Sequence, residues 1–465
     1  MIRPLSTQIA PRAMIAMQKT RSFIKAFAGL SIAFLSAAAT YVCAEADPDV
    51  EGAPWDIKFQ ATTVHQRKPS FAAAYSGANS LSTERERSWS ATATIFAGAR
   101  LWSGGEVYLN PEMAMGLPFS ALTGLGGFTN GELAKTSGTH PTFYRARAFL
   151  RQTWNIGAAS DSVEADQNQL AGKASPQRWV VTAGNFSAVD VFDRNAYNHE
   201  PRRQFLNWAI STHGAWDYPA DARGYTVGTA LEYYRPDWAF RAGRFMQPKE
   251  SNGLPLNPRI FFSYGDVAEV EHAYTLGSQP GRVRLLAFRN VARMASYQAA
   301  IDAASSSPGN GVPNINTVRA ERSKVGYGIN LEQAIGKDIG LFLRASRADG
   351  KTETFAYSEI DSSISGGIIL KGAPWARPND DLGIAIARNQ LSSSHSDYLR
   401  AGGLGFFLGD GALGYGPEQI TEVYYSAALT RNFWVSLNGQ RIRNPGYNTM
   451  RGPVSFFGLR MHIEF

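Results

Sequence analysis

The sequence predicts an all-β fold, a transmembrane antiparallel β-barrel of about 16 strands. Aromatic residues make up 12% of the chain and glycines number 45, whereas charged residues reach only 18%, less than in most soluble domains. After residue 44, no apolar stretch is long enough for a transmembrane helix. Apolar and polar residues instead alternate with a period of two, the period of a β-strand whose two faces meet different surroundings.

The first 44 residues are typical of a secretory signal peptide. A basic region ends at Lys25, residues 26–42 are uncharged and apolar, and a possible cleavage site surrounds Cys43. We expect residues 1–44 to be removed and residues 45–465 to form one barrel domain. An uncleaved N-terminal anchor and a lipoprotein modified at Cys43 are the alternatives. The apolar run is short for a membrane span, and Tyr41 and Val42 are bulky for a lipoprotein site.

Removal of residues 1–44 changes the net charge of the chain. All five charged residues in positions 1–44 are basic, so their loss lowers the net charge from +7 to +2. The basic character therefore belongs mostly to the export signal and gives no reason to expect nucleic-acid binding. Cys43 is the only cysteine, so the exported chain is expected to contain no disulfide.

Strand-like alternation recurs along the exported chain. Apolar residues occupy every second position in residues 55–62, and again in residues 89–99, which a Ser103-Gly104-Gly105 turn joins to residues 106–110. Two further runs, residues 421–429 and 433–440, are separated by Thr430-Arg431-Asn432. These pairs predict hairpins, and such short turns are typical of the periplasmic end of a barrel. Pro236 presets a similar turn between Tyr233 and Trp238.

The final residues also alternate. Leu459, Met461, Ile463 and Phe465 fall on one side, whereas Arg460, His462 and Glu464 fall on the other. We expect this last strand to pair with the first and close the barrel, with Phe465 as the terminal aromatic signal read by the outer-membrane assembly machinery. An exported β-sandwich or β-helix is the alternative, since one face of any antiparallel sheet can alternate. The longer polar stretches 117–141 and 305–316 are expected to be loops that point outward or fold into the lumen.

Several segments carry a family resemblance. They occur in this order: FYRARAFLRQ (143–152), TAGNF (182–186), DVFDRNAY (190–197), QFLNW (204–208), GAWDY (214–218), DARGY (221–225), PKESNGLP (248–255), RNPGYN (443–448), RGPV (451–454) and FGLR (457–460). Together they resemble the OprB-type family of carbohydrate-selective outer-membrane porins over roughly residues 55–465. The resemblance implies a sixteen-stranded barrel through which sugars such as glucose diffuse. Residues 305–316 and 357–368 depart from the family as variable loops, so the preferred sugar stays open.

Arginines supply the pore-lining candidates. In FYRARAFLRQ, strict alternation places Arg145, Arg147 and Arg151 on one face of a strand. Because an arginine facing lipid near the midplane costs about 2–4 kcal/mol, we expect this face to look into the lumen. Arg344 forms a similar inward position, and Tyr424 is a lumen aromatic suited to stacking on a pyranose. Alternatively, these arginines only set an anion preference or pair with lumen carboxylates.

The sequence gives less support to a metal site or to catalysis. The segment VDVFDRNAYNHE (189–200) is rich in Asp and Asn, but it lacks the Gly and terminal Glu of a calcium loop, so a hydrogen-bonded turn at the pore mouth is the preferred interpretation. No serine or cysteine lies in a recognisable nucleophile motif. The alternative of an outer-membrane lipid hydrolase is not favoured by His462, which falls on the polar face of its strand.

The sequence thus predicts a non-enzymatic porin in the Gram-negative outer membrane, with no cofactor and no metal. Its expected partners are sugars as permeants, outer-membrane lipid and the assembly machinery, and barrels associating as homo-oligomers are a further possibility. A general or anion-preferring porin and an adhesin or structural barrel with a plugged lumen are the remaining alternatives.

Overall fold

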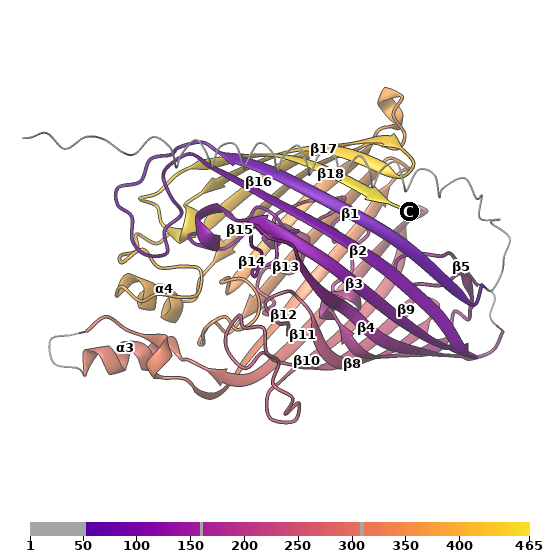
Figure 1. Cartoon of the computed structure of the whole chain (residues 1–465), viewed down its shortest axis with the longest axis horizontal. Helices are drawn as coiled ribbons and strands as arrows, with labels where there is room; N and C mark the ends of the chain where they lie inside the picture. The colour runs from indigo at the N-terminus through magenta and orange to yellow at the C-terminus, as the bar shows by residue number, and fades with distance from the viewer. Residues whose placement is uncertain (1–52, 159–160, 307–310) are drawn as a thin grey trace, which may run out of the picture. The chain divides into compact units, whose positions relative to one another are not determined.

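The computed structural model describes residues 53–158, 161–306 and 311–465. The expected signal peptide, residues 1–44, lies outside the described residues. Sixteen antiparallel strands form one closed barrel (Figure 1), which confirms the predicted fold class. They are β1 (Trp55–Lys68), β2 (Glu86–Trp102), β3 (Gly105–Leu117), β4 (Thr142–Asn155), β7 (Arg178–Phe186), β8 (Thr226–Arg235), β9 (Trp238–Met246), β10 (Tyr264–Leu276), β11 (Gln279–Met294), β12 (Ala320–Ile335), β13 (Ile339–Ala348), β14 (Ser362–Lys371), β15 (Asp381–Gln390), β16 (Glu418–Thr430), β17 (Phe433–Arg443) and β18 (Val454–Glu464).

The connections differ between the two ends of the barrel. Short turns such as 236–237 and 431–432 lie at one end, the turn end, and long loops such as 187–225 and 391–417 lie at the other, the loop end. A small hairpin of β5 (Asp161–Val163) and β6 (Gly172–Ala174) belongs to the turn end. Since short turns of such barrels face the periplasm, the loop end faces outward from the cell.

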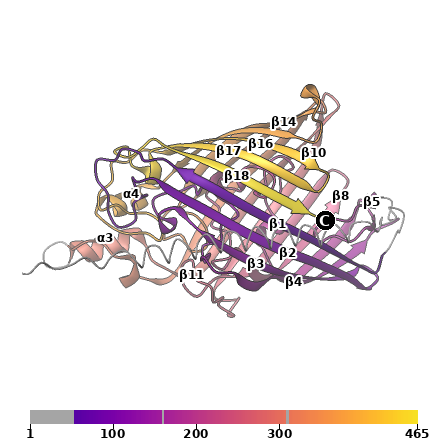
Figure 2. The same ribbon diagram turned by 45° about the horizontal axis from the view of Figure 1, so that its top comes forward.

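Three short α-helices occur within the described parts of the long loops: α2 (Trp208–Ser211), α3 (Tyr297–Ser305) and α4 (Ser393–Arg400). Figure 2 shows α3 and α4 at the end of the barrel opposite β5. No described helix has the length and apolarity needed to cross a membrane.

The last strand closes the barrel against the first. Strand β18 pairs with β1 from Gln60–Glu464 to Arg67–Phe457, and the two ribbons run side by side in both views (Figures 1 and 2). Beyond the strand, the N–H of Phe465 donates to the carbonyl of Phe59 at 2.9 Å, and the N–H of Phe59 donates to the carbonyl of Phe465 at 3.0 Å. The predicted closing strand is therefore confirmed.

Alternation along the strands separates the wall into two faces. In β18, Phe457 and Leu459 are exposed on the outward face, whereas Arg460 and His462 are buried on the inward face. Aromatic side chains also form an outward row across adjacent strands at the turn end, where Trp154 pairs with Trp179 and Trp179 stacks on Tyr233 with ring centroids 4.4 Å apart. Such a row is typical of a membrane interface.

One predicted loop is partly a strand. Residues 357–368 were expected to form a variable loop, but β14 begins at Ser362. The run of Ser and Gly in this stretch suggests a loop, yet small residues are needed on the inward face of the strand: a Cβ added at Gly367 would lie 2.6 Å from the ring of Phe342. Of residues 357–368, only 357–361 belong to the loop that connects β13 to β14.

We predict that Phe465 is required for efficient assembly. Deletion of Phe465 removes both the terminal ring and two backbone hydrogen bonds to Phe59, whereas Phe465→Ala removes only the ring. If the ring is the assembly signal, both variants reach the periplasm but give less heat-modifiable barrel in the outer membrane, and Phe465→Tyr assembles normally. Normal insertion of Phe465→Ala would show that the ring is not the signal.

Candidate functional site in the barrel lumen

The loop between β7 and β8, residues 187–225, folds into the lumen, and we call it the lumen segment. Its Asp190 binds Arg147 of β4, and its Asp193 binds Arg344 of β13. Farther along, its Arg203 binds Glu464 of β18. Because these strands lie on different sides of a closed barrel, the lumen segment crosses the interior.

Local sequence explains how the lumen segment turns. At its start, Ser187 donates its N–H to Asp190 Oδ2 at 2.9 Å, which stabilises a 3₁₀ turn at Ala188–Asp190. Farther on, Asn207 caps α2 by accepting the N–H of Ala209 at 3.0 Å. Glu422 of β16 accepts the N–H groups of Leu206 and Asn207 at 2.7 and 3.0 Å, so a wall carboxylate satisfies backbone groups that would otherwise be buried without partners.

Asp193 is the central attachment point. Its carboxylate is fully buried and accepts hydrogen bonds from Arg344 Nε at 2.8 Å, Asn330 Nδ2 at 2.6 Å and the N–H of His213 at 2.8 Å. Burial alone would raise the pKa of Asp193, but the adjacent Arg344 guanidinium holds it below its ordinary value. Loss of one partner of such a pair leaves a buried unpaired charge, at a cost of about 3–5 kcal/mol.

A second carboxylate joins the lumen segment to another loop. Asp217 binds Lys324 of β12 at 3.1 Å and also accepts three backbone N–H groups, those of Phe355, Ala356 and Tyr357, at 2.8–3.0 Å. The loop between β13 and β14, residues 349–361, is thereby held against the lumen segment.

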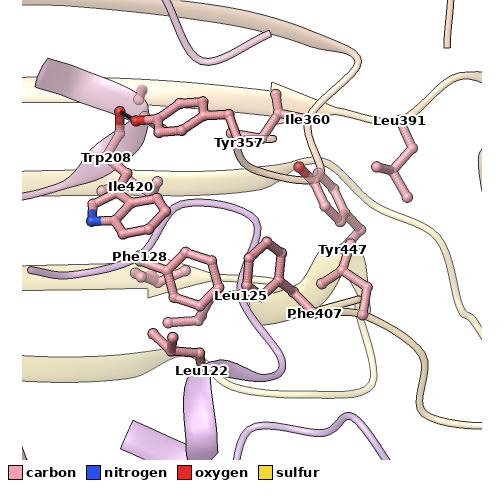
Figure 3. Close-up of a cluster of buried hydrophobic side chains, with 14 of the residues drawn as sticks. Leu122, Leu125, Phe128, Trp208, Tyr357, Ile360, Leu391, Phe407, Ile420 and Tyr447 are labelled. Atoms are coloured by element: carbon pink, nitrogen blue, oxygen red, sulfur yellow. Dashed lines mark hydrogen bonds between the residues drawn. The ribbon is translucent and has the colours of Figure 1, made fainter. Parts of the chain in front are cut away.

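Apolar side chains fill the lumen beside β13 to β18. Figure 3 shows Phe128, Trp208, Tyr357, Phe407 and Tyr447, which come from different loops and pack together. Trp208 and Tyr357 stack almost parallel, with ring centroids 5.4 Å apart, and the Tyr357 hydroxyl donates to the carbonyl of Trp208 at 2.9 Å. This side of the loop-end lumen is therefore occupied by a hydrophobic core.

Partly exposed polar side chains gather on the other side, near β3 and β4. Arg147 and Asp190 remain 13% and 28% exposed, whereas Arg344 and Asp193 are 1% and 0% exposed. Glu112 accepts from the hydroxyls of Tyr144 and Tyr225 and lies 3.4 Å from Arg202. We call this group the polar eyelet: Glu112, Tyr144, Arg147, Asp190, Arg202 and Tyr225. Glu112 and Tyr225 are buried, whereas Arg147, Asp190 and Arg202 keep 12–28% of their side chains exposed, so the group combines fixed donors, acceptors and aromatic rings and is partly exposed.

A second group lies toward the turn end. The Arg203 guanidinium lies 3.6 Å from the centroid of the Trp434 ring and 2.7 Å from Glu464. Arg203 and Glu464 keep 34% and 31% of their side chains exposed. They offer charged and aromatic contacts below the polar eyelet.

The structure does not place the three predicted arginines of β4 on one face of the strand. Arg147 faces the lumen, but the prediction is wrong for Arg145, which is exposed on the outward face. Asn110 pairs with Arg147 and Pro111 pairs with Arg145, so Ala146 is an extra residue in a β-bulge. Pro111 has no N–H for the ladder, which favours such an interruption. Because Arg145 lies near the loop end of β4, it avoids the high cost of the membrane midplane.

The other predicted residues occupy different settings. Arg151 faces inward, donates Nη1 to the carbonyl of Asn168 at 2.8 Å and stacks on Tyr108. Arg344 is buried beneath the lumen segment. Tyr424 is also buried, and its ring packs edge-on against Phe205 with centroids 4.9 Å apart. Arg344 and Tyr424 therefore support the lumen segment and leave almost no surface for a permeant.

The sequence reasoning missed several polar residues of the lumen. Glu112 lies on the inward face of β3, and Arg202 and Arg203 lie in the lumen segment. Adjacent arginines in a segment without strand alternation were the available signal. The Asp- and Asn-rich segment from Val189 is engaged in hydrogen bonds with the wall, inside the barrel rather than at its mouth, and no metal-binding group of three or more His, Cys, Asp or Glu residues occurs in the described part of the chain.

These features define a class of protein, the outer-membrane porins: a closed sixteen-stranded barrel with an in-folded loop and partly exposed polar side chains in its lumen. The sequence profile of the carbohydrate-selective porin, OprB family, matches residues 78–465. The chain therefore belongs to the OprB family. A comparison with curated protein sequences gave no match.

A solved structure shares the fold. The high-pH structure of Pseudomonas putida OprB is 17% identical, with a TM-score of 0.66. The match covers 89% of this chain and 94% of the Pseudomonas putida chain. The outer-membrane channel DcaP of Acinetobacter baumannii is 10% identical with a TM-score of 0.48, covering 88% and 97%. The trimer form of Vibrio cholerae OmpT is 13% identical with a TM-score of 0.46, covering 89% and 100%.

We predict that acid loosens the lumen segment through His213. Burial lowers the pKa of His213 to about 4, although Asp193 opposes this shift. Because the pKa in the folded state lies below the unfolded value of about 6.5, the stabilisation is complete above pH 6.5 and is lost as the pH falls toward 4. Single-channel recordings at pH 4.5 should show more current fluctuations than at pH 7.5. His213→Gln should reduce this difference, and an unchanged pH response would contradict the assignment.

Proposed function

We propose that the polar eyelet is the narrow, selecting section of a passive channel for sugars across the outer membrane. Membership of the carbohydrate-selective OprB family supports the substrate class. A passive channel needs contacts that replace water around the permeant but remain weak enough for release. The eyelet offers guanidinium donors, carboxylate acceptors and tyrosine rings that suit the hydroxyls and apolar faces of a pyranose.

One observation carries the proposal. Arg147 donates Nε and Nη2 to Asp190 at 2.7 and 2.6 Å, while its Nη1 has no hydrogen-bond partner in the described part of the chain. A buried donor without a partner is costly. The Arg147 and Asp190 side chains keep 13% and 28% of their surface exposed, so a sugar hydroxyl passing the eyelet would meet the exposed part of this ion pair without breaking it.

The proposed role includes no catalysis. The family and the structural neighbours are porins, and His462 faces inward, with Nδ1 2.8 Å from the hydroxyl oxygen of Thr62. Homo-oligomers and recognition by the assembly machinery belong to the same proposal.

Liposome swelling tests the function directly. Proteoliposomes containing the folded protein should swell in isosmotic glucose and more slowly in a disaccharide, because the larger solute makes more contacts at the eyelet. A general anion-preferring pore would instead favour anionic solutes over neutral sugars of similar size. Release of fatty acid without sugar flux would support a hydrolase, and neither activity would indicate a plugged barrel.

Two conservative substitutions test the eyelet. Arg147→Lys keeps a positive charge beside Asp190 but removes the planar guanidinium that binds Asp190 through two nitrogens, whereas Arg145→Lys changes an outward-facing arginine of the same strand. A hydrogen bond from a charged donor is worth about 1.5 kcal/mol, so Arg147→Lys should weaken glucose block of the ion current about 10-fold. Arg145→Lys should leave it unchanged. Equal glucose block in both variants and the unmodified protein would exclude Arg147 as a sugar contact.

A further inference from the structure

The outward face of the barrel carries exposed arginines near its loop end. Six of them lie on strands β13, β15, β17, β1 and β2, each within three residues of the loop end of its strand. We call this set the outer arginine arc: Arg347, Arg388, Arg441, Arg443, Arg67 and Arg87. Their outward orientation follows from alternation, because each shares its face with exposed apolar residues such as Ile386 on β15 and Leu437 on β17.

The arc differs from the arginines of the lumen. Arg147, Arg284 and Arg344 all lie within 3.1 Å of a carboxylate oxygen. In the described part of the chain, no carboxylate oxygen lies within 4 Å of any of the six arc guanidiniums. Within the same residues, their side chains make one hydrogen bond, which Arg441 Nη1 donates to the hydroxyl of Ser455. The arc is therefore a row of exposed cations without counter-charge from the protein.

Two arc residues are directly opposed. Arg67 of β1 and Arg87 of β2 are cross-strand partners in the sheet register. Like charges directly opposite on antiparallel strands destabilise the pair. An anion bound between the two guanidiniums would remove this repulsion.

A second copy of the chain is poorly suited to supply that anion. Across the sixteen described wall strands, the carboxylates on the outward face are Asp266 of β10 and Glu321 of β12. Asp266 already accepts two hydrogen bonds from Arg244 of β9, both at 2.7 Å. Another barrel wall would thus bring at most one free carboxylate to six arginines.

The position of the arc points to lipid. The loop end faces outward from the cell, and near this interface an outward arginine costs little and can reach the phosphates of the head groups. Guanidinium groups bind phosphates through two parallel hydrogen bonds. We propose that the outer arginine arc binds phosphorylated lipid head groups of the outer leaflet. The proposal depends on the barrel and its orientation and not on which solute passes through.

The test uses the folded, full-length exported protein in detergent with bisphosphorylated lipid A as the probe. The thermal transition of the barrel is followed by heat-modifiability during the titration. The unmodified protein should be stabilised by bisphosphorylated lipid A, and R67Q/R87Q/R441Q/R443Q should bind it about 100-fold more weakly or worse. The matched control R244Q/D266N removes an outward ion pair without changing net charge and should bind like the unmodified protein. If the fourfold variant does not fold, R441Q/R443Q provides the same comparison with a smaller loss.

Three results would overturn the proposal. Equal affinity of the arc variant and the unmodified protein would exclude the arc as the binding surface. Equal stabilisation by dephosphorylated lipid A would show that acyl chains alone are recognised, and equal stabilisation by inorganic phosphate would indicate a free-anion site. Sedimentation of the same variants provides one more check, because loss of self-association with unchanged lipid A binding would make the arc an interface between copies of the chain.

Discussion

The buried ion pair between Arg344 and Asp193 anchors the middle of the lumen segment to the barrel wall. Both side chains are at most 1% exposed, and Asn330 and the His213 N–H complete the coordination of the carboxylate. A charge buried without its partner would be strongly destabilising, so the lumen segment and β13 keep a single relative position. Together with the Arg147–Asp190, Lys324–Asp217 and Arg203–Glu464 pairs, this attachment holds the lumen segment across the interior. The hydrophobic core lies on one side of the segment, and the partly exposed polar eyelet lies on the other.

The side chains on the two faces of the barrel wall have different roles. Outward positions meet lipid and are mostly apolar, so charged residues concentrate inside, where they can pair. Within the lumen, exposure separates two roles. Fully buried pairs such as Lys324–Asp217 hold loops in place, whereas partly exposed pairs such as Arg147–Asp190 and Arg203–Glu464 remain available to a solute. The exposed arginines of the outer arginine arc are among the exceptions on the lipid face, and phosphorylated head groups would supply the counter-charge that the arc lacks.

Most of the fold could be predicted from the sequence because alternation is a local signal. The strands containing Trp55, Trp89, Val423 and Leu459 and the closure of the last strand were all identified in this way. The candidate site was harder to predict from the sequence. The β-bulge at Ala146 reverses the face of Arg145, and only Pro111 on the neighbouring strand hinted at it. Whether an inward arginine is free or buried depends on partners far away in sequence, as for Arg344 and Asp193, which no local pattern reveals.

A double-mutant cycle on this pair, read by single-channel conductance, tests the central claim most directly. Asp193→Ala and Arg344→Ala should each release the lumen segment and raise the conductance. The double variant should show little further increase, because both changes remove the same attachment. Heat-modifiability would verify that each variant still forms a barrel. Unchanged conductance in folded single variants, or fully additive increases in the double variant, would contradict the claim that this pair sets the width of the passage.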